Sequence, residues 1–127
     1  MDLKQPLQDL LRKTSGSSGA ILIDNEGEAI TYLAKEGVET LSEISEDERV
    51  RLIGAYQRIV LRECKRTVEE MRIGKLSNIV IRYESGIVAV RALKEEYALV
   101  LIGGHDMLIG QGLFYLNKYA EIIDSDL

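Results

Sequence analysis

Apolar residues recur along the chain with helical spacing in three segments. The longest, Ser45–Ile73, begins with a capping box formed by Ser45 and Glu48, and Gly74 follows its last residue. Leucines at helical spacing predict a short helix over residues 3–13. A third helix is predicted after Asp106, its expected N-cap, with an inner stripe made of Ile109, Leu113, Leu116, Ala120 and Ile123.

Five further segments have the composition and spacing of strands. They are Ala20–Ile23, Glu28–Leu33, Lys75–Tyr83, Ile87–Leu93 and Tyr97–Ile102. Asp24–Gly27 predicts a hairpin turn between the first two, because Asn and Gly tolerate left-handed backbone. We expect a flexible polar loop over Thr14–Gly19 and a polar connection over residues 36–44. The buried anchors expected in that connection are Val38, Leu41 and Ile44.

This order, α-β-β-α-β-β-β-α, predicts an α+β fold with a five-stranded antiparallel sheet. The two most apolar strands, the first and the fifth, belong in the middle, which gives the strand order 2-1-5-4-3 and leaves the second and third strands at the edges. Helices must cover both faces of such a sheet. We expect the long helix on one face and the two terminal helices on the other, in a single domain over residues 1–127.

The long helix has more apolar surface than one core uses. Its core face is predicted to comprise Val50, Ile53, Tyr56, Val60, Leu61, Cys64, Val68 and Met71. Leu52, Ala55 and Ile59 form a second patch, which is either a protein interface or the ordinary exposure of single apolar residues. A basic stripe with seven-residue spacing either faces an acidic partner or is solvated, and its members are Arg51, Arg58, Lys65 and Arg72.

Length, charge and cysteine content exclude several classes of protein. A chain of 127 residues can bury one hydrophobic core, and its net charge of −5 argues against nucleic-acid binding. No apolar run approaches the roughly 20 residues of a membrane span, and the N-terminus lacks the pattern of a signal peptide. Cys64 is the single cysteine, so no internal disulfide can form. We therefore expect a cytoplasmic protein without membrane insertion.

The residue types that catalytic and metal sites need do not occur in suitable combinations. His105 is the single histidine, which excludes a histidine metal cluster or a Ser-His-Asp triad within one chain. The glycines of residues 16–19 lack the lysine of a P-loop, and Gly110–Gly112 lacks the third glycine of a dinucleotide fingerprint. We expect no catalytic residue, cofactor or metal, and a capping or surface role for His105.

The chain resembles the Roadblock/LC7 family, which contains the roadblock-type dynein light chains and the prokaryotic MglB-like regulators. Residues 19–30, with the sequence GAILIDNEGEAI, look like the first hairpin of that family. Residues 77–93, followed by residues 97–102, look like its strand meander, and Gly110–Ile123 looks like its last helix. The resemblance covers nearly the whole chain and includes no catalytic motif.

The resemblance implies a homodimer, or a heterodimer with a paralogous subunit. In such a dimer the third strand pairs with its mate and the long helices pack together. The predicted strand order independently places that strand at an edge, and an uncovered edge is a template for association. The predicted interface residues are Leu52, Ala55, Ile59, Ile79, Ile81 and Tyr83.

Members of this family commonly bind small Ras-like GTPases, either as scaffolds or as activators. The resemblance therefore implies a non-enzymatic module that binds an MglA-like GTPase and modulates its activity or location. The chain ends at Leu127 without the extended tail of the long family members, so we expect no catalytic contribution and assign no arginine finger. Two alternatives stay open, a small-molecule sensor and a structural adaptor of motility or motor machinery.

Overall fold

The computed structural model describes residues 2–35 and 46–127. Its elements are α1 (Lys4–Lys13), β1 (Ser17–Ile23), β2 (Ala29–Ala34), α2 (Glu46–Met71), β3 (Asn78–Tyr83), β4 (Gly86–Ala92), β5 (Ala98–Gly104) and α3 (Ile109–Asp124). A short turn, Lys94–Glu96, joins β4 to β5. The predicted connection with Val38, Leu41 and Ile44, and the first residue of the predicted capping box, lie outside the described residues.

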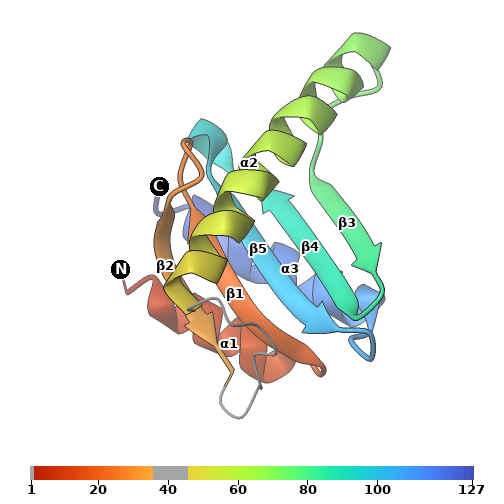
Figure 1. Ribbon diagram of the computed structural model, residues 1–127. Helices are drawn as coiled ribbons and strands as arrows, with labels where there is room; N and C mark the ends of the chain where they lie inside the picture. Colours follow the sequence, from red (N-terminus) through yellow and green to blue (C-terminus); the bar gives the residue numbers. More distant parts are fainter. Residues whose placement is uncertain (1, 36–45) are drawn as a thin grey trace.

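The five strands form one antiparallel sheet in the order β2-β1-β5-β4-β3, which confirms the predicted fold class and strand order. The two central strands pair along their length, with Ala20 opposite Leu101 and Ile23 opposite Ala98. At the other side of the sheet, β3 pairs with β4, and Ile81 lies opposite Val88. The strands β2 and β3 are therefore the edges, as Figure 1 shows.

Helices lie on both faces of the sheet, as predicted (Figure 1). On one face α1 and α3 enclose a core with side chains from β1, β4 and β5, and its fully buried members include Leu7, Leu10, Leu22, Leu99, Leu101, Leu116 and Ile123. On the other face α2 begins over β2 and β1, and its second half projects past the end of the sheet (Figure 1). Where α2 packs on the sheet, Leu61 is buried, and Ile53 is partly buried, against Ile21, Ile23 and Val100.

The sequence prediction was wrong about part of the core face of α2. Tyr56 and Met71, both expected in the core, have exposed fractions of 63% and 59%. The residues buried instead include Gly54, Gln57 and Arg58.

The rotation of α2 has a physical cause in one close contact. A Cβ placed on Gly54 would overlap the carbonyl oxygen of Gly27, so α2 can pack this closely against the β1–β2 turn only with a glycine at this position facing the turn. Turning Gly54 inward carries Tyr56 outward. Among the other predicted core positions of α2, Leu61 is buried and four are half-buried, namely Ile53, Val60, Cys64 and Val68. The side chain of Val50 lies outside the described part of the chain.

Several predicted element boundaries also differ from the structure. The helix α2 ends at Met71, before Gly74, because Arg72 adopts a left-handed φ of 57°. Ser17 belongs to β1, not to a loop, because it pairs with Gly103 of β5, and its buried hydroxyl donates to the carbonyl oxygens of Leu11 and Thr14. Leu108, and not Asp106, holds the N-cap position of α3. The inner stripe of α3 is confirmed at its buried members, Leu116, Ala120 and Ile123.

Candidate interaction surface

The outward side of α2 carries a contiguous apolar patch. Leu52, Tyr56 and Ile59 are 44%, 63% and 56% exposed, and Ala55 is also exposed. Their spacing of i, i+3, i+4 and i+7 places them on one face of the helix. We call these four residues the α2 patch. Three of them are predicted from the sequence, whereas Tyr56 is missed because the helical pattern assigns it to the core.

The edge strand β3 presents apolar side chains beside an edge that no described strand pairs with. Ile79 and Ile81 lie opposite Val90 and Val88, so they share the sheet face on which α2 lies. Both are half-buried, whereas Tyr83 is 43% exposed. The strand thus combines free backbone hydrogen-bonding groups with apolar side chains, the combination that favours pairing with a further strand.

A groove connects the second half of α2 with β3. Its volume is about 420 Å³, and its walls are mostly apolar. Cys64 and Val68 line it from α2, Ile79 lines it from β3, and Leu76 lines it from the segment between them. The remaining lining residues are Glu63, Thr67 and Asn78. Unlike a closed cavity, this groove is open to solvent, and it adjoins the unpaired edge.

The predicted basic stripe is only partly exposed. Arg51, Lys65 and Arg72 are exposed, so they remain available to an acidic partner. Arg58 is 7% exposed, and the interpretation of this residue as partner-facing was wrong.

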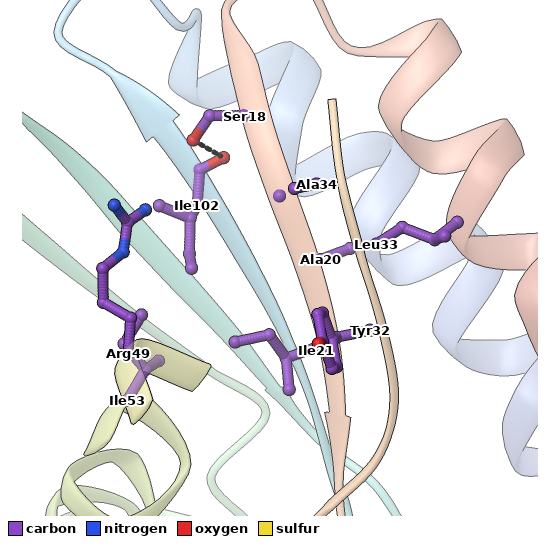
Figure 2. A pocket seen from close by; sticks show the side chains of 10 residues that line it. Ser18, Ala20, Ile21, Tyr32, Leu33, Ala34, Arg49, Ile53 and Ile102 are labelled. Atoms are coloured by element: carbon purple, nitrogen blue, oxygen red, sulfur yellow. Dashed lines mark hydrogen bonds between the residues drawn. The ribbon is translucent and has the colours of Figure 1, made fainter. Parts of the chain in front are cut away.

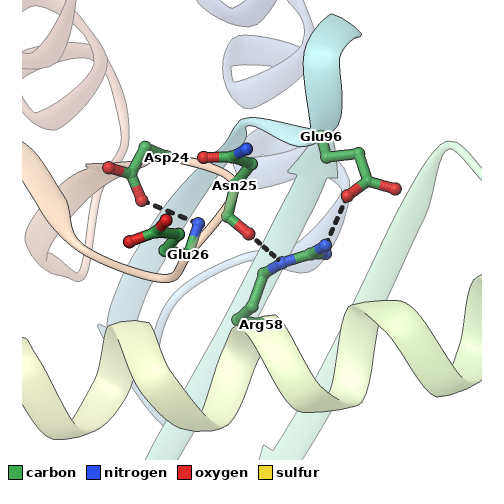
Figure 3. A network of polar contacts seen from close by, with 5 residues as sticks. All are labelled: Asp24, Asn25, Glu26, Arg58 and Glu96. Atoms are coloured by element: carbon green, nitrogen blue, oxygen red, sulfur yellow. Dashed lines mark hydrogen bonds and ion pairs between the residues drawn. The ribbon is translucent and has the colours of Figure 1, made fainter.

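Arg58 instead points inward, to the end of the sheet where two turns meet (Figure 3). Its Nε donates a hydrogen bond of 2.6 Å to the carbonyl oxygen of Asn25 in the β1–β2 turn. Its Nη2 forms an ion pair of 2.5 Å with the carboxylate of Glu96 in the β4–β5 turn. Both contacts supply partners for the charge, which offsets the cost of burying the guanidinium. We call these contacts the Arg58 bridge.

Two other hollows bear on the small-molecule alternative. A pocket of about 40 Å³ lies between β1, β2, β5 and the start of α2. Arg49 and Tyr32 are among its lining side chains (Figure 2). This volume suits about one water molecule, whereas ligand pockets usually measure about 300–1,000 Å³. A shallow groove of about 360 Å³ lies between α1 and α3, lined by Asp2, Gln5, Pro6, Asp9, Tyr119 and Ile122.

Within the described ranges, no group of three or more His, Cys, Asp or Glu side chains is placed to hold a metal ion. No helix in the same part of the chain is long and apolar enough to cross a bilayer. His105 is exposed, in the segment between β5 and α3.

The α+β fold of this chain also occurs in proteins of known structure. No family model matches the sequence, and no curated protein does. Solved structures do match. An MglB with a tetrameric arrangement has a TM-score of 0.84 at 16% identity, over 97% of this chain and 85% of that one.

Two further matches agree with the first. The gliding protein MglB from Thermus thermophilus has a TM-score of 0.83 at 16% identity, over 98% of this chain and 90% of that one. A Roadblock/LC7 domain from Streptomyces avermitilis has a TM-score of 0.78 at 11% identity, over 97% and 95%. The chain therefore has the Roadblock/LC7 fold, as the sequence resemblance implied.

Proposed function

We propose that the chain is a cytoplasmic, non-enzymatic regulatory or scaffold module of the Roadblock/LC7 family, and that it works as a dimer. The observation that carries the proposal is the position of three features on one side of the molecule. The unpaired edge of β3, the groove beside it and the α2 patch all lie toward the same face of the sheet. A second copy, or a paralogous subunit, would cover them together.

The exposure of these features to solvent favours the formation of a dimer. An unpaired strand edge favours association, and exposed apolar area gains free energy when it leaves water. The predicted interface comprises Leu52, Ala55, Ile59, Ile79, Ile81 and Tyr83, and Tyr56 joins it because of its position in the structure. The tetrameric arrangement of one MglB is a property of that protein, and it supports self-association of this fold.

We further propose that the dimer binds a small Ras-like GTPase and modulates its activity or location. The support is the family resemblance together with the fold match to MglB. Two exposed cations on α2, Arg51 and Lys65, and the exposed Arg72 just after its end suit an acidic surface on the partner.

Size-exclusion chromatography with MglA-like GTPases encoded in the same genome tests this function. Each GTPase is loaded with GDP or with a non-hydrolysable GTP analogue before mixing. We expect co-elution in at least one nucleotide state. The rate of GTP hydrolysis in the complex then separates a regulator, which changes the rate, from a scaffold, which leaves it unchanged. Failure of every candidate GTPase to co-elute in both states would contradict the proposal and favour a structural adaptor.

A further inference from the structure

The Arg58 bridge joins three segments that are far apart in the sequence. Arg58 comes from the middle of α2, Asn25 from the turn after β1, and Glu96 from the turn before β5. The Arg58 side chain is 9% exposed, whereas that of Glu96 is 52% exposed. Because the guanidinium is buried, losing the Glu96 carboxylate would leave part of its charge without a partner. The bridge therefore ties the position of α2 to the conformation of the β4–β5 turn.

That turn has an unusual backbone for its sequence. Glu95 and Glu96 have φ values of 59° and 65°, and the Tyr97 amide donates to the Lys94 carbonyl oxygen at 3.2 Å. Two successive left-handed residues closed by such a bond form a type I′ hairpin turn, whose central positions strongly favour Asn-Gly or Gly-Gly. Two glutamates are disfavoured there. Turn geometry alone therefore does not explain this sequence.

The bridge supplies an explanation for Glu96 but not for Glu95. The left-handed backbone at residue 96 carries its carboxylate toward α2, where it meets Arg58 (Figure 3). In the part of the chain that the structure describes, the exposed Glu95 makes no hydrogen bond or ion pair with α2. Beside the bridge, Gly54 and Gly27 approach so closely that neither a Cβ on Gly54 nor one on Gly27 fits easily. The two contacts together fix one stretch of α2 against the β1–β2 turn.

We propose that the Arg58 bridge is a positioning device that holds α2 in one orientation on the sheet, and that Glu96 keeps its unfavourable turn conformation for this purpose. Arg58 lies between Ala55 and Ile59 in the sequence, so its anchoring fixes where the α2 patch points. The consequence for association rests on the proposed function. A shift of α2 would move the patch relative to β3 and the groove, and would weaken the binding of a second copy.

Glu95→Gly and Glu96→Gly form a matched pair that tests the proposal. Both substitutions remove one carboxylate and relieve one left-handed non-glycine residue in the same turn, but only Glu96→Gly breaks the bridge. We expect Glu95→Gly to raise Tm by about 3 °C and to leave hydrogen exchange in α2 unchanged. We expect Glu96→Gly to bring no such gain and to speed amide exchange around residues 54–61 about tenfold, with exchange in α3 unchanged.

An Arg58→Met background completes the test. Without the guanidinium, the two glycine substitutions should have equal effects on Tm and on exchange in α2. Arg58→Gln is the second background, because it keeps a donor for the Asn25 carbonyl oxygen if the methionine variant does not fold. Equal behaviour of Glu95→Gly and Glu96→Gly with Arg58 present would overturn the proposal.

The measurements separate this proposal from the proposed function. Exchange is measured at a concentration where the protein is monomeric, so it reports the bridge alone. The dissociation constant for self-association is then compared between the two variants, and we expect Glu96→Gly to raise it at least fivefold and Glu95→Gly to leave it unchanged. A wild-type protein that never associates would overturn the proposed function, while the exchange result would still decide whether the bridge positions α2.

Discussion

At the scale of single residues, glycines determine how closely the elements approach one another. Gly54 faces the backbone of the β1–β2 turn, where a Cβ would meet the Gly27 carbonyl oxygen and a methyl group of Ile23. Gly110, near the start of α3, has open space where its Cβ would be. Neither glycine needs a left-handed backbone, so the difference between them is one of available space alone.

This difference predicts opposite effects of alanine at the two positions. Gly54→Ala should lower the free energy of unfolding by about 2 kcal/mol, because the obstructing atoms are backbone atoms that cannot rotate away. Gly110→Ala should raise it by up to about 1 kcal/mol, because alanine reduces the conformational freedom of the unfolded chain and favours the helix. Urea unfolding curves measure both changes, and equal shifts in the same direction would contradict the steric explanation.

At the scale of elements, the sequence was sufficient for the sheet but not for the orientation of α2. Apolar alternation identified the strands, and the apolar character of β1 and β5 placed them in the centre. The helical period of α2 was equally clear, yet period alone does not fix which residue faces inward. That choice depends on Gly54 meeting Gly27, a tertiary contact without a local sequence signal.

For the candidate surface, too, the sequence was sufficient for some residues but not for others. The exposure of Leu52 and Ile59 followed from the helical pattern, and the edge position of Ile79 and Ile81 followed from the strand order. The burial of Arg58 could not be predicted, because its partner Glu96 lies 38 residues away. A seven-residue spacing of cations describes one side of an isolated helix and carries no information about the turns packed against it.

The groove between α2 and β3 gives a prediction about this pair of elements. Cys64 is half-buried and lines the groove, so a second copy seated there should shield its thiol. We expect the rate of maleimide labelling of Cys64 to fall as the protein concentration rises above the dissociation constant. In the control, Cys64→Ser combined with Lys118→Cys, the thiol is on the exposed side of α3 and its labelling rate should not depend on concentration. If the labelling rate of Cys64 does not depend on protein concentration either, no second copy covers the groove.

At the scale of the whole molecule, exposed apolar side chains occur on both helical layers. On the α3 side, Leu108, Phe114 and Ile122 are 63%, 64% and 41% exposed. These fractions match those of the α2 patch, so exposure alone does not identify an interface. The α2 patch differs because it lies on the layer that also contains the groove and the inward-facing residues of the β3 edge. The proposed self-association is therefore expected on the α2 side.

Matched charge substitutions on the two layers decide between these surfaces. Leu52→Asp with Ile59→Asp places two carboxylates where a second copy would bury them without partners, so light scattering should give the monomer mass instead of the dimer mass. Leu108→Asp with Ile122→Asp adds the same charge at equally exposed positions on the opposite layer and should leave the dimer intact. If only Leu108→Asp with Ile122→Asp gives the monomer mass, the interface lies on the α3 side instead. A wild-type protein that is monomeric at high concentration would contradict the proposal that a second copy covers the β3 edge and the apolar groove beside it.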